Sequence, residues 1–172
     1  MREQDAPTEP VHAPLVPASV TLPEITLKAV VLSILLAAVL AGANAYLGLF
    51  AGMTVSASIP AAVVSMAVLR LFRQSNILEN NIVQTAASSG EALAAGVIFT
   101  IPGLVLIGYW TSFDYWQTFT VSLVGGVLGV LFTIPLRRAL IIHARLRFPE
   151  GVATAEVLKV GASSDAGAGG RV

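Results

Sequence analysis

Four polar residues recur along NNIVQTAASSGEALAAGVIF, residues 80–99 of a sequence that is otherwise strongly apolar. Asn81, Gln84, Ser88 and Glu91 follow one another at spacings of three, four and three residues, which places them on one face of a helix. A carboxylate in a membrane costs several kcal/mol unless it is paired, protonated or hydrated. These residues, together with Ser89, are therefore our candidates for a substrate or proton pathway.

Two hypotheses account for Glu91. The residues from Ala92 to Trp110 form a helix of about 28 Å at 1.5 Å per residue, which can cross a bilayer alone. Residues 76–91 would then lie in the interface, with Glu91 in the first turn of the span, where the helix dipole favours an acid. Alternatively, the segment is broken at Ser88-Ser89-Gly90 and its polar stripe lines a transport pathway, as broken helices do in transporters.

Two further polar segments are candidates. Asn44, in AGANAYLG, can hydrogen-bond across helices or face a cavity. Glu150 and Glu156 belong to FPEGVATAEVLKVG, residues 148–161. This segment is predicted either as a capped surface helix with an ion pair between Glu156 and Lys159, or as a helix that lines an aqueous cavity or re-enters the membrane.

The sequence offers no catalytic group. It contains no phosphate-binding loop, dinucleotide fingerprint, zinc motif or nucleophile elbow, so we do not expect an enzyme. It has no cysteine, and its two histidines, His12 and His143, are too far apart to predict a metal site. The arginines that follow residue 136 are explained by membrane topology, and no nucleic-acid partner is expected.

The elements that must position these residues are membrane helices. The chain has 172 residues, is 55% hydrophobic and only 12% charged, and has a mean hydropathy of +0.80. A soluble domain is nearer a quarter charged. We therefore predict an all-α, polytopic helical membrane protein, with about four transmembrane helices plus a further helix or re-entrant segment. The predicted spans are residues 25–50, 53–72, 82–110 and 116–136.

The ends of the chain differ from the middle. Residues 1–24 are rich in proline and acidic residues and are predicted to form a disordered cytoplasmic tail. Residues 25–161 would form the helical bundle, and residues 162–172 a flexible glycine-rich loop or tail. Lys and Arg are concentrated in alternate loops, which predicts a cytoplasmic N-terminus. We expect the protein in the plasma (inner) membrane.

Three blocks resemble the oligopeptide transporter family, which includes the yellow stripe-like carriers of metal chelates. They are NAYLGLFAGMTVSASIPAAVVS (44–65), ILENNIVQTAASSGEALAAGVIFTIPGLVLIG (77–108) and RFPEGVATAEVLKVG (147–161). The resemblance implies a secondary transporter of small peptides or metal–chelate complexes, driven by a proton gradient and needing no cofactor. Since family members are much longer, it also implies that this chain is an N-terminal part whose partners are the bilayer and the remaining helices. The alternative is a non-transporting membrane scaffold or accessory subunit that packs through small residues.

Overall fold

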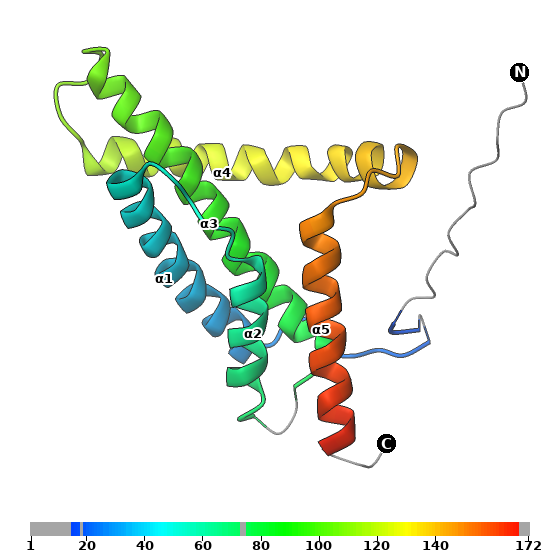
Figure 1. The fold of residues 1–172 in the computed structure, drawn as a ribbon. Coiled ribbons are helices and arrows are strands. Elements are labelled where there is room, and N and C mark those ends of the chain that lie inside the picture. Colours follow the sequence, from blue (N-terminus) through cyan, green and yellow to red (C-terminus); the bar gives the residue numbers. More distant parts are fainter. Residues whose placement is uncertain (1–14, 18, 73–74, 169–172) are drawn as a thin grey trace, which may run out of the picture.

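The computed structural model describes residues 15–17, 19–72 and 75–168, with side chains up to residue 163. These residues form helices and no strand (Figure 1). Three helices are long and apolar enough to cross a membrane: α1, α3, and α4 together with the π-helix η1. The helices are α1 (Leu27–Ala51), α2 (Ser58–Leu69), α3 (Ile77–Leu106), α4 (Tyr115–Arg137), η1 (Arg138–His143) and α5 (Pro149–Ala168). The prediction of a polytopic, all-α membrane protein is confirmed.

Polar caps determine where the long helices begin. Thr26 accepts a hydrogen bond from the backbone of Ala29 at the start of α1, and Asp114 accepts one from Gln117 at the start of α4. Asn76 and Glu79 form a capping box at the start of α3. These side chains satisfy backbone N–H groups that have no partner within the helix.

Helices α1 and α3 pack side by side and run in the same direction (Figure 1). Thr26 meets Glu79 where the two helices begin. Further along, a Cβ atom added to Gly90 would lie 2.9 Å from the Cβ of Ala37, and one added to Gly48 would meet Ile98. The order of these contacts is the same in both helices, so the helices are parallel. The chain between them must therefore return along their whole length.

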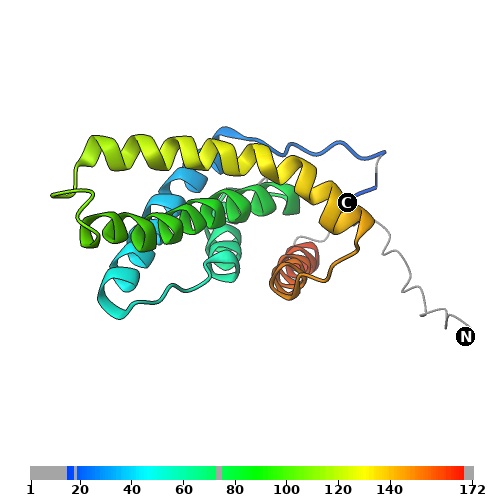
Figure 2. The ribbon, with the colours of Figure 1, turned by 90° about the horizontal axis from the view of Figure 1, so that it is seen from above.

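The returning segment, residues 53–69, begins with five non-helical residues, 53–57, which we call the extended segment, and continues as helix α2. Ser58 contacts Ser88, and Thr54 lies against Gly48 where that glycine meets Ile98. Along α3, the distance from residue 88 to residue 98 is about 15 Å at 1.5 Å per residue. The four steps from residue 58 back to residue 54 cover most of this distance, whereas four helical residues would rise only about 6 Å, so the backbone here is largely extended, with Ala57 as the exception. Figure 2 shows this stretch as a loop between α1 and α2.

The structure corrects two expectations about helix continuity. Residues 53–72 do not form one spanning helix, because α2 begins only at Ser58 and Pro60 falls in its first turn, where no backbone N–H is needed. Conversely, α3 is unbroken at Ser88-Ser89-Gly90. The Ser89 hydroxyl donates to the carbonyl of Thr85 within the helix, and Gly90 allows α1 to approach closely.

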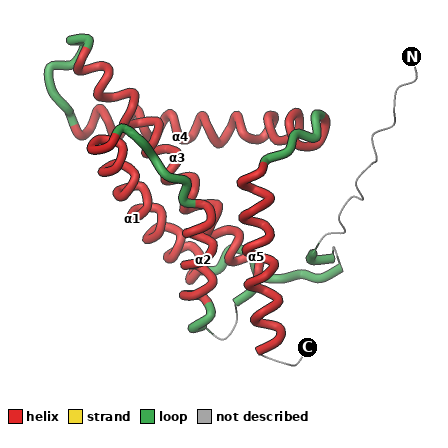
Figure 3. Tube along the Cα trace, in the orientation of Figure 1, coloured by secondary structure: helices red, strands yellow, loops and turns green. Residues whose placement is uncertain are grey.

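The remaining helices are placed around this core. Helix α5 packs against α2 and α3, whereas α4 lies across α3 and has no buried residue (Figures 1 and 3). Residues 162–168, predicted as the start of a flexible tail, continue α5 in the structure; three of these seven residues are alanine, the best helix former. Residues 1–14 and 18 of the predicted N-terminal tail, and residues 169–172, lie outside the described residues.

The contact at Gly90 yields a test of the α1–α3 packing. We expect Gly90→Ala to lower the thermal stability of the detergent-solubilised protein relative to Gly96→Ala. Both changes improve helix propensity by about 1 kcal/mol, but only the first forces a methyl group against Ala37, an overpacking that costs about 1–3 kcal/mol. A Cβ at Gly96 would meet no described atom within 4 Å. Equal melting temperatures for the two variants would contradict the packing.

Candidate functional site

The side chain of Asn44 holds the extended segment in place. Its Nδ2 donates to the carbonyl of Val55 at 2.9 Å, and its Oδ1 accepts from the N–H of Val55 at 3.0 Å. Asn44 is 4% exposed, so its own side chain has little contact with water. Of the two roles predicted for Asn44, the structure shows hydrogen bonding, with the extended backbone as its partner. Non-helical backbone at membrane depth persists only where protein or a wet cavity satisfies it.

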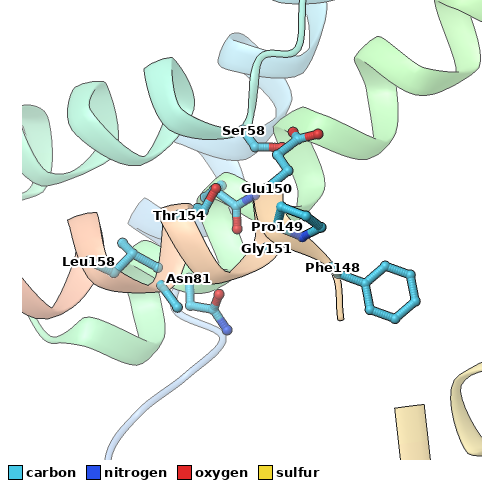
Figure 4. Close-up of a pocket in the computed structure, with 10 residues that line it drawn as sticks. Ser58, Asn81, Phe148, Pro149, Glu150, Gly151, Thr154 and Leu158 are labelled. Carbon is cyan, nitrogen blue, oxygen red and sulfur yellow. The ribbon is translucent and has the colours of Figure 1, made fainter. Parts of the chain in front are cut away.

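A cavity of about 590 Å³ lies where α2 and α5 begin beside α3 (Figure 4). It brings together polar residues that the sequence places in two separate segments, the stripe on α3 and the start of α5. The lining residues are Ser58, Asn81, Gln84, Phe148, Pro149, Glu150, Gly151, Thr154, Ala155 and Leu158.

Serine hydroxyls at the start of α2 link this cavity to its neighbours. Ser56 donates a hydrogen bond to Glu150, and Ser58 shares one of 2.9 Å with Ser88 of α3. Hydrogen bonds from Ser56 and Ser58 lower the pKa of Glu150, which is exposed and lies outside the three candidate spanning helices, and outweigh a small opposing effect of desolvation. Glu150 therefore remains a carboxylate at neutral pH, and no ion pair to it is found among the described residues.

Thr154 is the residue of this site that sequence reasoning missed. It is 4% exposed, and its Oγ1 is the one buried side-chain polar atom in the described part of the chain without a hydrogen-bond partner. A buried hydroxyl without a partner is costly and rare. The available signal was its position four residues after Glu150, which places both on one face of α5.

The other residues predicted for the pathway divide into two groups. Glu91 is 8% exposed and lies one turn beyond Ser88 on α3, level with the extended segment. Within the described residues, its carboxylate has no hydrogen bond or ion pair. Ser89 is on another side of α3, facing α4. Glu156 forms an exposed ion pair with Lys159 at 2.7 Å, as the surface-helix alternative expects.

A second buried carboxylate, Glu79, was not predicted as a functional residue. It is fully buried where α1 and α3 begin, 3.1 Å from the ammonium group of Lys28. Its carboxylate also accepts hydrogen bonds from the hydroxyl of Thr26 at 2.5 Å and from the backbone of Asn76 at 3.3 Å. The spacing of Asn76 and Glu79 in the sequence is that of a capping box, which was the available signal.

Parallel apolar helices, a returning segment that is only partly helical and a polar cavity beside it are features found in helical membrane transporters. The family model described as OPT oligopeptide transporter protein matches residues 24–168, and the chain belongs to this family. The resemblance found in the sequence is therefore confirmed.

Two curated relatives are each described as a "putative oligopeptide transporter". The protein of Haemophilus influenzae is 57% identical over 124 residues, which cover 72% of this chain and 19% of the relative. The protein of Saccharomyces cerevisiae is 28% identical over 160 residues, covering 81% of this chain and 22% of the relative. The chain thus spans about a fifth of the length of these relatives. No solved structure matches it at a significant level.

The role of Asn44 can be tested against that of Asn81, which is exposed and lies on α3. We expect Asn44→Ala to lower the free energy of unfolding by about 1–3 kcal/mol for each backbone group of Val55 left without a partner. Asn81→Ala should leave stability nearly unchanged. Thermal unfolding in detergent measures both, and equal stability would show that Asn44 does not hold the segment.

The buried ion pair predicts a non-additive mutant cycle. Lys28→Met leaves the charge of Glu79 without its cation and should destabilise the protein by about 3–5 kcal/mol. Adding Glu79→Gln removes that charge and keeps a polar side chain at the cap, so the double variant should recover part of the loss. A double variant less stable than Lys28→Met would argue against a buried pair.

Proposed function

We propose that this chain forms part of a proton-coupled transporter of short peptides in the plasma membrane, with its N-terminus in the cytoplasm. The observation that carries the proposal is Glu91, a buried carboxylate of a spanning helix without a partner among the described residues. An ionisable group inside a membrane is a functional candidate because its burial is too costly to be retained without use. The proton gradient supplies the energy, and no cofactor is required.

The position of Glu91 suits proton exchange. Glu91 lies on α3 level with the extended segment. Backbone groups of a non-helical segment can bind water, whereas those within a helix are already paired with one another. The polar stripe continues from Glu91 through Ser88 to Gln84, which lines the cavity. A proton on Glu91 would neutralise the carboxylate and lower the cost of moving it between environments.

Glu79, unlike Glu91, has partners for its carboxylate among the described residues. Its carboxylate is bound to Lys28, Thr26 and the backbone of Asn76, so its charge is compensated in place. Removal of Lys28 would leave the buried charge of Glu79 without its counter-ion. We therefore assign Glu79 to holding α1 against α3, and Glu91 to proton transfer.

A peptide is the substrate class that best fits the cavity. The names of the two relatives refer to oligopeptide transport. The cavity lining combines amides, hydroxyls and apolar side chains and contains no Lys, Arg or His. Hydroxyl and amide groups can hydrogen-bond a peptide backbone, whereas carboxylate-rich metal chelates would call for a positively charged lining. Metal chelates remain the second substrate class that family membership suggests.

Reconstitution of the complete gene product into proteoliposomes tests the coupling role of Glu91. With an imposed proton gradient, we expect Glu91→Gln to abolish gradient-driven uptake of a labelled tripeptide while leaving exchange of bound peptide intact. Glutamine keeps the size and polarity of the side chain but cannot release a proton.

Glu156→Gln is the matched control, because Glu156 is an exposed acid on α5 that is paired with Lys159. It should retain uptake close to that of the unmodified protein. Gradient-driven uptake that survives in Glu91→Gln would refute proton transfer by Glu91. A lack of peptide uptake by the unmodified protein would refute the proposed substrate class.

A further inference from the structure

The cavity at the start of α5 has a single charged residue. Among its lining residues only Glu150 is ionisable, and the hydroxyls of Ser56 and Ser58 hold its carboxylate in position. Hydroxyl groups orient the carboxylate without neutralising it. No cation is paired with Glu150 in the described part of the chain. The cavity therefore carries one negative charge, which is exposed to solvent and has no cation beside it among the described residues.

The unpartnered hydroxyl of Thr154 lies one helical turn from Glu150. Residues four apart on a helix are neighbours, with Cβ atoms about 5–6 Å apart. Thr154 and Glu150 line the same cavity, so a group that donates several hydrogen bonds and lies beside the carboxylate also lies beside Thr154. Gln84, on the facing helix α3, adds an amide oxygen to the same cavity. The site thus offers several acceptors to one donor group.

An anion is a poor ligand for this site, although the N-terminus of a helix usually favours one. Glu150 is the acid in the first turn of α5 and already interacts with the helix dipole there. A second negative charge would be repelled by the Glu150 carboxylate. A cation with several N–H donors has the complementary chemistry, and a primary ammonium carries three donors.

We propose that this cavity binds the free amino end of a short peptide, with its ammonium group between Glu150 and Thr154. This inference rests on the proposed function and specifies which end of the substrate the site recognises. Phe148, Ala155 and Leu158 provide apolar surface for the first side chain of the peptide. A cavity of about 590 Å³ has the size of a small-ligand site.

Binding and uptake are measured separately on the complete gene product. Binding of trialanine, N-acetyl-trialanine and C-terminally amidated trialanine is measured by ligand-induced thermal shift. We expect trialanine and its amide to bind alike, and the acetylated peptide to bind about tenfold or more weakly, since it lacks the charged donor. N-acetyl-Lys-Ala-Ala, which carries its ammonium on a side chain, should also bind weakly if the site recognises the peptide end.

Two substitutions locate the subsite. Glu150→Gln should weaken trialanine binding about tenfold or more and leave binding of the acetylated peptide unchanged. Thr154→Val has the same shape and removes the unpartnered hydroxyl, so it should raise the melting temperature of the free protein while weakening trialanine binding several-fold. A variant that merely disturbed folding would shift both quantities in the same direction. Glu156→Gln is the control for charge on α5 and should change neither.

The possible failures are distinguishable. Equal binding of the free and acetylated peptides, no binding of trialanine, or unchanged selectivity in Glu150→Gln would each overturn the subsite. Tight binding of N-acetyl-Lys-Ala-Ala would reassign the site to a side-chain ammonium and overturn recognition of the peptide end. Selective binding of trialanine without any peptide uptake would support the subsite and count against the proposed transport function.

Discussion

Two hydrogen bonds between the side chain of Asn44 and the backbone of Val55 determine how the rest of the structure is arranged. An extended backbone inside a membrane needs partners for its N–H and C=O groups, and a neighbouring helix has none to offer. Asn44 supplies one donor and one acceptor from a buried position on α1. The extended segment covers a long distance in few residues. The chain can therefore return from the end of α1 to the start of α3, which allows the two helices to pack in parallel.

The partly helical form of the returning segment also creates the polar site. Because α2 starts partway along α3, its first hydroxyl meets Ser88, and the preceding one reaches Glu150 on α5. Three carboxylates then occupy three environments. Glu79 is buried and paired with Lys28, Glu91 is buried without a described partner, and Glu150 is held by hydroxyls at a cavity. From these environments we infer a packing role for Glu79, and we propose proton transfer for Glu91 and substrate binding for Glu150.

Much of the fold could be predicted from the sequence, because hydropathy determines which segments enter the membrane and polar caps determine where helices begin. Asn76 and Asp114 precede their helices as capping residues should. The break in residues 53–72 could not be predicted, because an apolar segment has the same hydropathy whether its backbone is extended or helical. Its cause is a hydrogen bond between Asn44 and a residue eleven positions away.

Ser88-Ser89-Gly90 suggested a break, but in the folded chain Gly90 allows close packing against α1 and Ser88 forms a hydrogen bond to α2. The role of Thr154 was equally hidden, because an unpartnered hydroxyl can be recognised only once its surroundings are known.

Cysteine scanning of residues 53–69 in native membranes tests the partly helical form of the returning segment most directly, since the chain contains no cysteine of its own. The rate of reaction with a small, membrane-impermeant thiol reagent would be measured at each position. The account predicts fast reaction at residue 55, slow reaction at residue 57, and a pattern of about 3.6 residues from residue 58 onward, since Val55 is exposed and Ala57 is buried. One continuous helix would place residue 55 on the same face as Ser58 and residue 57 off that face, so slow reaction at residue 55 together with fast reaction at residue 57 would contradict the account.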